Sequence, residues 1–238
     1  MKKQLIKWVG SWAVAISTVL FLSCHNSPDP LPIIFFDSTF ESGLDNWTGD
    51  FAFYKSTQES AIKFNVKEDV LPASLKSTLH GLKLEGTNQG DSILLFIKKK
   101  VTNLDPAKTY KVAYQIDFAS NLPDTLSGAG RIAYLKAGAS TEEPKKTLIN
   151  SYYSVSIKSG NVAKSGSELL LLGNLANGLD STYYKAVSRN NANLAVQVKP
   201  SAAGEIWLCV AISTTYKGTI AMYFDRIYAA VGEKTTKP

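Results

Sequence analysis

The spacing of apolar residues after residue 32 predicts a protein built almost wholly of β-strands. The clearest signal lies in residues 109–119, where apolar side chains occupy every second position: Tyr110, Val112, Tyr114, Ile116 and Phe118. Strict alternation of this length predicts a strand that buries one face in the core and exposes the other. The uninterrupted apolar run Ile33–Phe36 predicts the strand that opens the domain.

Shorter apolar or alternating runs predict the remaining strands, and turn residues separate them. The predicted strands cover residues 61–66, 82–85, 93–97, 131–136, 151–157, 168–172, 192–198, 205–213 and 219–231. The sequence predicts no helix longer than a turn and contains no internal repeat. Many short strands in one domain, without alternation of strands and helices, predict an all-β fold of the sandwich or jelly-roll type.

Residues 1–24 follow a different pattern. Three lysines, at positions 2, 3 and 7, precede an apolar run that ends at Ser23, and Cys24 follows. A positive flank, a short apolar core and a small residue at the cut are the parts of a secretory signal. The apolar run is shorter than the ~20 residues that a membrane-spanning helix needs. We therefore expect residues 1–23 to be a cleaved signal peptide rather than a transmembrane anchor.

The end of this stretch, Leu20–Cys24, resembles the lipobox of bacterial lipoproteins, in which signal peptidase II cleaves before a cysteine that carries thioether-linked lipid. Phe21 and Leu22 depart from the usual pattern of leucine followed by a small residue. The resemblance implies a covalent lipid on Cys24 and an exported protein. It would be anchored in the cell envelope of a Gram-negative bacterium, in the outer membrane rather than the inner. Each methylene group of an acyl chain that is buried in the membrane contributes ~0.8 kcal/mol of binding free energy. Two or three acyl chains would therefore anchor the protein in the membrane almost permanently.

These expectations divide the chain into four parts. Residues 1–23 are the predicted signal peptide, and residues 24–32 are the lipidated cysteine and a tether rich in proline and polar side chains. Residues 33–232 form the predicted β-sandwich, and residues 233–238 a disordered tail. A domain of about two hundred residues is large enough to bury most of its apolar surface in one core.

The charge of the chain gives no reason to expect a nucleic-acid partner. Removal of the signal peptide takes away three lysines and no acidic residue, so the formal net charge falls from +6 to 26 − 3 − 20 = +3. The one dense basic run, Lys98–Lys100, continues the apolar strand 93–97. Lysine commonly protects a sheet edge from unwanted pairing, so this run predicts a solvated strand end.

Cysteine and histidine are scarce in this chain, and we expect no cofactor to be required. With Cys24 lipidated, Cys209 has no partner for a disulfide, and its apolar neighbours predict a buried thiol. His80 is the only histidine of the domain, because His25 lies in the tether. A single imidazole excludes a metal site built on two histidines.

Four short motifs resemble those of jelly-roll carbohydrate-binding modules with a galactose-binding-domain-like fold. Phe40–Trp47 is similar to their F-E-x-G-…-W opening, and Tyr223–Tyr228 to their last strand, which carries an aspartate among apolar residues. Leu79–Leu84 is similar to their glycine before a short strand, and Leu104–Tyr110 to their L-x-P-x-x-x-Y entry to a central strand. The resemblance covers most of residues 37–231 and implies a single jelly-roll β-sandwich.

Such modules often hold a structural Ca²⁺ between an acid of the opening motif and the aspartate of the last strand. Carried over, the ligands would include Glu41 and Asp225, with backbone carbonyls completing the oxygen shell. Arg226 stands where a second Asp or Asn is frequent in the family. A salt bridge from Arg226 to Glu41 or Asp225 is therefore the favoured interpretation, ahead of the metal.

Sugar binding in this fold uses aromatic rings and a few polar groups that fix orientation. In strand 205–213 the aliphatic residues share one face, which places Trp207 on the other. Trp207 could line a groove with Gln115 and Asp117, which point away from the aliphatic face of their own strand. The favoured alternative is that a loop from residues 121–179 covers Trp207, because tryptophan is usually largely buried.

Other aromatic residues have different expected positions. Trp47 should pack beneath the sheet, as in the family's opening motif. Tyr152 and Tyr153 point to opposite faces of their strand, so at least one is expected to be exposed, and Tyr216 lies in an accessible turn. Tyr153 and Tyr216 therefore join the candidate ligand-binding residues.

The sequence thus predicts a lipid-anchored envelope protein with a non-catalytic binding module, and a polysaccharide or other glycan is the first choice of ligand. A structural or protein-binding lipoprotein is the alternative. A jelly-roll enzyme acting on glycans is a distant third, and no catalytic residue is assigned. The chain contains neither a G-x-S-x-G elbow nor the E-x-D-x-x-E pair of carboxylates that sandwich glycosidases carry.

Overall fold

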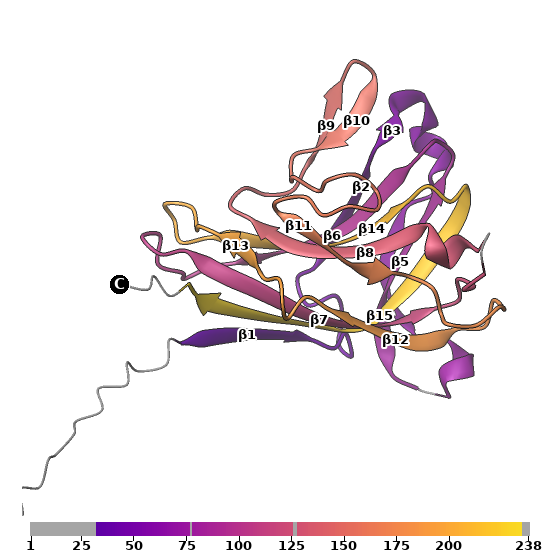
Figure 1. The fold of residues 1–238 in the computed structure, drawn as a ribbon, viewed down its shortest axis with the longest axis horizontal. Coiled ribbons are helices and arrows are strands. Elements are labelled where there is room, and N and C mark those ends of the chain that lie inside the picture. The colour runs from indigo at the N-terminus through magenta and orange to yellow at the C-terminus, as the bar shows by residue number, and fades with distance from the viewer. Residues whose placement is uncertain (1–31, 77, 126–127, 235–238) are drawn as a thin grey trace, which may run out of the picture. The chain divides into compact units, whose positions relative to one another are not determined.

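The computed structural model describes residues 32–76, 78–125 and 128–234. Within these ranges the chain folds into two large antiparallel sheets that pack face to face, and a small third sheet (Figure 1). Short 3-10 helices interrupt the strands at η1 (Ser56–Ala61), η2 (Ala73–Leu75) and η3 (Ala129–Arg131). The predicted all-β, jelly-roll sandwich is confirmed.

The larger sheet, sheet A, has seven strands, each antiparallel to its neighbours. Its main order is β12-β7-β15-β5-β4, while β1 pairs with β15 and β13 pairs with β7. The strands are β1 (Ile33–Ser38), β4 (Asn65–Val70), β5 (His80–Asn88), β7 (Tyr110–Ser120), β12 (Lys185–Asn190), β13 (Val196–Val198) and β15 (Gly218–Glu233). The first part of β15 pairs with β5 and the later part with β1, so one long strand joins both halves of the sheet.

Sheet B has five strands in the order β11-β8-β14-β6-β2. They are β2 (Thr48–Ala52), β6 (Ile93–Val101), β8 (Ala133–Ser140), β11 (Leu169–Asn174) and β14 (Ile206–Thr214). The third sheet consists of β3 (Tyr54–Lys55), β10 (Tyr152–Val155) and β9 (Lys146–Ile149). Strands β9 and β10 form a hairpin that projects from the sandwich in Figure 1.

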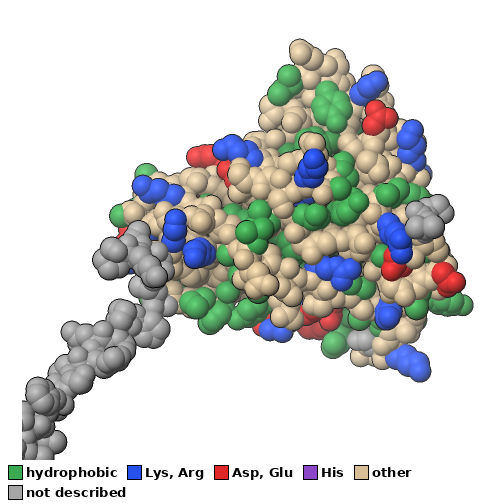
Figure 2. Space-filling model, viewed as in Figure 1, with side chains coloured by type: hydrophobic (Ala, Val, Ile, Leu, Met, Phe, Trp, Pro, Cys, Tyr) green, Lys and Arg blue, Asp and Glu red, His purple; other side chains and the backbone are tan. Residues whose placement is uncertain are grey.

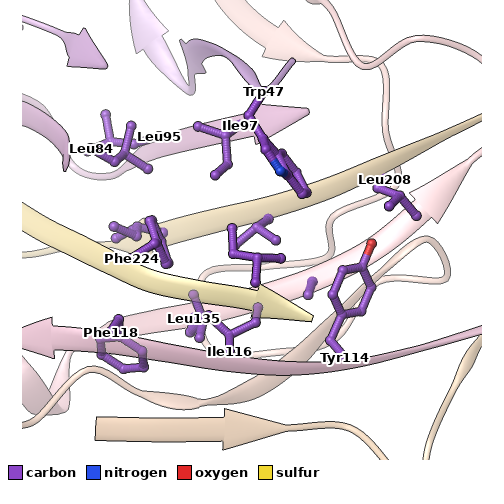
Figure 3. Close-up of a cluster of buried hydrophobic side chains, with 14 of the residues drawn as sticks. Trp47, Leu84, Leu95, Ile97, Tyr114, Ile116, Phe118, Leu135, Leu208 and Phe224 are labelled. Atoms are coloured by element: carbon purple, nitrogen blue, oxygen red, sulfur yellow. The ribbon is translucent and has the colours of Figure 1, made fainter. Parts of the chain in front are cut away.

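The core lies between sheets A and B, because strands of both sheets turn their apolar side chains inward. On β7, Tyr114, Ile116 and Phe118 point inward and are almost fully buried, as their alternation predicts (Figure 3). Trp47 is only 2% exposed, and its indole N–H donates a hydrogen bond to the Ser38 hydroxyl at 3.0 Å. The prediction that Trp47 packs beneath the sheet is confirmed.

The outer face of sheet B is covered by residues 155–166, called the covering segment below. Outward-facing side chains of β6 and β14, among them Phe96 and Cys209, form a second buried cluster with Ile157 of this segment. Cys209 is therefore the buried thiol that its neighbours predict, and burial raises its pKa.

A buried lysine fixes the covering segment. Lys136 extends outward from β8, and its ammonium group donates hydrogen bonds to three backbone carbonyl oxygens: Ser159 at 2.8 Å, Asn161 at 2.5 Å and Lys164 at 2.9 Å. Burial lowers the pKa of Lys136 to about 8, so the group is still mostly charged at pH 7. One side chain thus supplies the donors for several carbonyls of the loop.

Two local predictions are wrong. The strand predicted at residues 61–66 begins only at Asn65, because residues 56–61 form η1. Contrary to the prediction, Lys98–Lys100 does not lie at a sheet edge, because β6 pairs with β14 on one side and with β2 on the other. Each of these lysines has an acidic partner: Lys98 with Glu143 at 2.8 Å, Lys99 with Asp45 at 2.6 Å and Lys100 with Glu205 at 3.1 Å. On the face shown in Figure 2, basic side chains are scattered rather than gathered in one stripe.

The predictions for the N-terminus lie outside the described residues. They are the signal peptide 1–23, the lipid on Cys24 and most of the tether, and they stay predictions. In the ranges that the structure does describe, no helix has the length and apolar character needed to cross a membrane.

Candidate functional site

The outer face of sheet A, called the open face below, differs from that of sheet B because its outward side chains near β1 and β7 are exposed or half-buried. These outward residues are Lys111, Ala113, Gln115 and Asp117 on β7, Arg226, Tyr228, Ala230 and Gly232 on β15, Ile33, Phe35 and Asp37 on β1, and Ser188 and Asn190 on β12. A broad sheet surface that carries aromatic, amide and charged groups in contact with solvent is the candidate site.

Two aromatic rings and a guanidinium stack on one another in the open face. The centroids of the Phe35 and Tyr228 rings are 5.6 Å apart, and the ring planes are inclined by 21°. The Arg226 guanidinium lies 5.2 Å from the centre of the Tyr228 ring, within the range of a cation–π attraction. Phe35 ends the stack and is 57% exposed. An apolar ring that is held in place and turned to solvent is suited to contact with a ligand.

Asp37 of β1 holds Arg226 in this stack. The guanidinium donates two bonds to the carboxylate, Nε to Oδ1 at 2.6 Å and Nη2 to Oδ2 at 2.7 Å. This two-point hydrogen bonding favours the charged forms, so it lowers the pKa of Asp37 and raises that of Arg226. The predicted pairing of Arg226 with Glu41 or Asp225 is wrong, because β1 lies beside β15 and brings Asp37 to Arg226 instead.

Small side chains and amides lie next to the stacked rings. Ala230 of β15 lies opposite Phe35 on one side and opposite Ala113 on the other. In the next outward row, Gln115 of β7 lies opposite Asn190 of β12, and both amides are exposed. Three strand spacings of about 4.8 Å each make this part of the face about 14 Å wide. A flat ligand that packs against the small side chains of Ala113 and Ala230 could therefore contact an aromatic ring and two amide groups.

The Asp37–Arg226 pair predicts a pH dependence for binding at the open face. Because the folded-state pKa of Asp37 is lowered, the pair is complete above the ordinary aspartate pKa of about 3.9 and is lost as the pH falls through the lower folded value. We expect binding of a ligand at the open face to be constant between about pH 5 and about pH 8. Binding should weaken only below the ordinary aspartate pKa of about 3.9, as the pH falls through the lower folded value of Asp37. Affinity measured against pH checks this, and an equal acid loss in Asp37→Asn would contradict it.

Trp207 does not lie beside Gln115 and Asp117, so the predicted common groove is wrong. β14 directs Trp207 outward from sheet B, whereas β7 directs Gln115 and Asp117 outward from sheet A, on the opposite side of the sandwich. Trp207 is half-buried, and the ammonium groups of Lys98 and Lys100 lie 5.9 and 5.3 Å from its ring centre. The alternative that a loop from residues 121–179 buries Trp207 stays a prediction, since Trp207 keeps part of its surface in contact with solvent.

Tyr153 and Tyr216 offer less free ring surface than a ligand platform would need. Both are half-buried and pack against the main core. The Tyr153 ring also stacks on Tyr54, with 4.8 Å between centroids. Of the two neighbouring tyrosines, Tyr152 is the exposed one, at 39%. Neither predicted tyrosine belongs to the open face.

Glu41 and Asp225 are close enough for their charges to interact, but they are not part of a larger cluster of metal ligands. Burial and the charges of Asp117 and Glu41 raise the pKa of Asp225. The Glu41 carboxylate accepts a hydrogen bond from the backbone N–H of His80 at 3.3 Å. In the described part of the chain, no three His, Cys, Asp or Glu side chains come together as a metal site. Calcium would need backbone carbonyls as well, and its binding stays a prediction.

Sequence patterns do not reveal the aromatic part of the open face. The apolar run Ile33–Phe36 predicts the opening strand but does not show which of its side chains face solvent. β1 pairs only with β15 among the described strands, and Phe35 is exposed. The bond between Asp37 and Arg226 joins residues 189 positions apart, which no local pattern predicts. A usable signal for Tyr228 is its position between two inward-facing residues of the last strand.

Comparisons with known proteins give remote likenesses only. No protein-family model matches the chain, and no curated protein matches it. Among solved structures, the enzymatically active domain of tailspike protein 4 of bacteriophage CBA120 is 12% identical with a TM-score of 0.35; the match covers 82% of this chain and 20% of that one. This chain thus spans about a fifth of the tailspike chain.

Two carbohydrate-binding modules are also among the solved structures that match. A module described as recognising mannan is 10% identical with a TM-score of 0.35, over 86% of this chain and 99% of that one. The family 11 module of a cellulosomal cellulase of Clostridium thermocellum is 12% identical with a TM-score of 0.35, over 87% of this chain and 99% of that one. At these identities and TM-scores the likenesses do not identify a ligand, which has to follow from the geometry of the open face.

Proposed function

We propose that this protein is lipid-anchored in the cell envelope and that its β-sandwich binds carbohydrate without catalysing a reaction. The observation that carries the proposal is the stack in the open face, which ends in the exposed ring of Phe35 beside the amides of Gln115 and Asn190. The flat C–H face of a sugar ring can lie on an aromatic ring. Amide groups both donate and accept hydrogen bonds, as sugar hydroxyls require.

The shape of the open face favours a chain of sugars as the ligand. Its rings and amides lie in neighbouring rows across β12, β7, β15 and β1 instead of surrounding one cavity. A flat surface about 14 Å wide can hold several units of a polysaccharide side by side. Asp37 is already bound to Arg226, so its role is to fix the stack and not to attack a glycosidic bond.

The anchoring part of the proposal rests on residues 1–24. A lipid on Cys24 would leave residues 25–32 as a tether of at most about 29 Å before β1 begins. The domain would then stay close to the membrane and bind glycans of the envelope or its surroundings. Mass spectrometry of the mature protein checks this: a lipid-modified N-terminal Cys24 is expected, and a chain that still begins at Met1 would contradict it.

Phe35→Ala tests the proposed ligand site. The full-length protein, in mild detergent, is applied to a panel of neutral and acidic polysaccharides beside its variants. We expect the parent to bind at least one polysaccharide class, and Phe35→Ala to bind it at least about tenfold more weakly, because aromatic anchors carry much of the energy of an interface. Phe35 is exposed and outside the core, so the variant should still fold.

Two control variants locate the effect. Tyr183→Ala removes another strongly exposed ring, 71% accessible, that is not part of the open face, and Trp207→Ala removes the ring on sheet B. Both should bind like the parent. Loss of binding in Trp207→Ala alone would place the ligand on sheet B. No binding to any polysaccharide would favour a protein partner, and release of reducing sugars by the parent would favour an enzyme.

A further inference from the structure

A hollow of about 170 Å³ lies where four separate segments of the chain meet. Its wall combines residues of β3 and η1, the turn between β5 and β6, strand β10 of the projecting hairpin, and the turn between β14 and β15. Convergence of polar and aromatic side chains from several segments is typical of small-molecule sites. None of the residues already assigned to the open face lines this hollow.

The lining combines ring surface with hydrogen-bonding groups. Phe53 and the exposed Tyr152 supply apolar ring surface. Gln89 supplies an amide, Asp91 a carboxylate and Lys217 an ammonium group. Within the described residues, neither Asp91 nor Lys217 forms a salt bridge, so both remain available to a ligand. Burial raises the pKa of Tyr152 above the ordinary tyrosine value.

Lys146 of β9 attaches the hairpin that carries Tyr152 to the rest of the sandwich. The Lys146 ammonium lies 4.5 Å from the centre of the Phe51 ring and 5.3 Å from that of Tyr153. It also forms an ion pair with Glu59 of η1 at 2.9 Å. These cation–π and ionic contacts fasten β9 to β2 and η1. Tyr152, on the neighbouring strand, is thereby kept at the mouth of the hollow.

Two residues of the lining, Phe53 and Gly90, have backbone features that shape the hollow. Phe53 has a φ of 67°, a left-handed conformation that is unfavourable for a bulky side chain and that occurs in turns and at functional sites. Gly90 allows close approach: a Cβ at this position would lie 3.3 Å from the Gln58 amide. The carbonyl of that amide accepts a bond from the Lys55 N–H at 2.9 Å, so Gln58 forms a fixed part of the wall.

We propose that this hollow binds a single sugar ring, such as the end of a glycan chain. The ring lies against Tyr152, its hydroxyls donate to Asp91, and Gln89 and Lys217 donate to its oxygens. The hollow is smaller than the roughly 300–1,000 Å³ of sites that enclose larger ligands, which favours one ring over several.

This site is separate from the open face, and neither requires the other. Lys217 precedes Gly218, the first residue of β15, whereas Tyr228 of the stack lies ten residues further along the same strand. At about 3.3 Å per residue this separates the two sites by about 33 Å. A protein that holds the interior of a polysaccharide on one surface and a chain end at another would gain affinity from both contacts.

The test uses the full-length protein and the methyl glycosides of glucose, galactose, mannose and N-acetylglucosamine, with binding followed by ligand-observed NMR. We expect at least one glycoside to bind with a dissociation constant on the order of 1 mM, because one ring makes few contacts. Tyr152→Ala should weaken this binding at least about tenfold, and Asp91→Asn about fivefold. Tyr183→Ala, which leaves both the hollow and the open face intact, should bind within about twofold of the parent.

The outcomes separate this proposal from the open-face proposal. Glycoside binding that is lost in Tyr152→Ala but kept in Phe35→Ala supports the hollow, whether or not polysaccharide binds to the open face. Glycoside binding that is lost in Phe35→Ala and kept in Tyr152→Ala overturns it. So does the absence of binding to all four glycosides, or equal binding by parent, Tyr152→Ala and Asp91→Asn.

Discussion

Lys136→Met should release the covering segment from sheet B and lower the free energy of unfolding by about 3 kcal/mol. Methionine keeps an apolar stem of similar length but has no donor for the carbonyls of Ser159, Asn161 and Lys164, which accept bonds from Lys136. The bond to Ser159 is buried, whereas the bonds to Asn161 and Lys164 are part-buried. A carbonyl that is left without a partner away from water costs about 1–3 kcal/mol. Part of this loss is offset, because the variant no longer buries a charge. Urea denaturation of parent and variant measures the difference.

The thiol of Cys209 reports on the same event. Cys209 is fully buried beneath the covering segment in the parent, so a thiol reagent can reach it only when that segment opens. We expect labelling of Cys209 in Lys136→Met to be at least about tenfold faster, because local opening becomes more frequent. Peptide mass spectrometry identifies the labelled cysteine.

Lys111→Met is the matched control. Lys111 is exposed on β7, and no salt bridge involves it in the described part of the chain. The same chemical change there should alter stability by less than about 0.5 kcal/mol. Equal stability and equal thiol labelling of the Lys136 and Lys111 variants would contradict the role given to Lys136.

The fold was predictable from the sequence to the extent that alternation decides which way a side chain points. Tyr114, Ile116 and Phe118 are inward in the structure, as their spacing on β7 predicts. Where a strand contains consecutive apolar residues, alternation gives no answer. Ile33–Phe36 is such a case, because burial depends on β15, which lies almost two hundred residues later in the chain.

The candidate site was only half predictable for a related reason. Gln115 and Asp117 do belong to the open face, because the alternation of β7 correctly directs them outward. Trp207 is directed outward by the same rule, but sequence does not show that β7 and β14 lie in different sheets. Nor does it show which outer face a loop will cover. That choice depends on tertiary contacts such as those of Lys136.

The covering segment therefore leaves the outer face of sheet A, rather than that of sheet B, as the proposed binding surface. Both sheets have outward aromatic residues, Trp207 on sheet B and Phe35 on sheet A. The neighbours of Trp207 on β14 are buried, whereas the neighbours of Phe35 on the open face stay in contact with solvent. Any change that lifts the segment should expose a second apolar surface and promote aggregation.

Gly138→Ala is expected to force β11 away from β8 and to lower the free energy of unfolding by about 3 kcal/mol. A Cβ at Gly138 would lie only 1.8 Å from the carbonyl oxygen of Glu168 and 2.8 Å from its carbonyl carbon. These are backbone atoms, so no rotamer change can relieve the overlap. Separation would also break the bond from the Ala139 N–H to the Glu168 carbonyl, now 3.1 Å long. Overpacking alone typically costs about 1–3 kcal/mol.

Gly232→Ala provides the matched control for this prediction. A Cβ at Gly232 would have its nearest neighbour, Cγ1 of Ile33, at 3.5 Å, which is an ordinary contact. This variant should stay within about 0.5 kcal/mol of the parent in urea denaturation. Hydrogen exchange of the Ala139 amide should accelerate in Gly138→Ala and not in Gly232→Ala. If both variants were equally stable and Ala139 equally protected, β8 and β11 could not approach as closely as the structure shows, and the cover over sheet B would need another explanation.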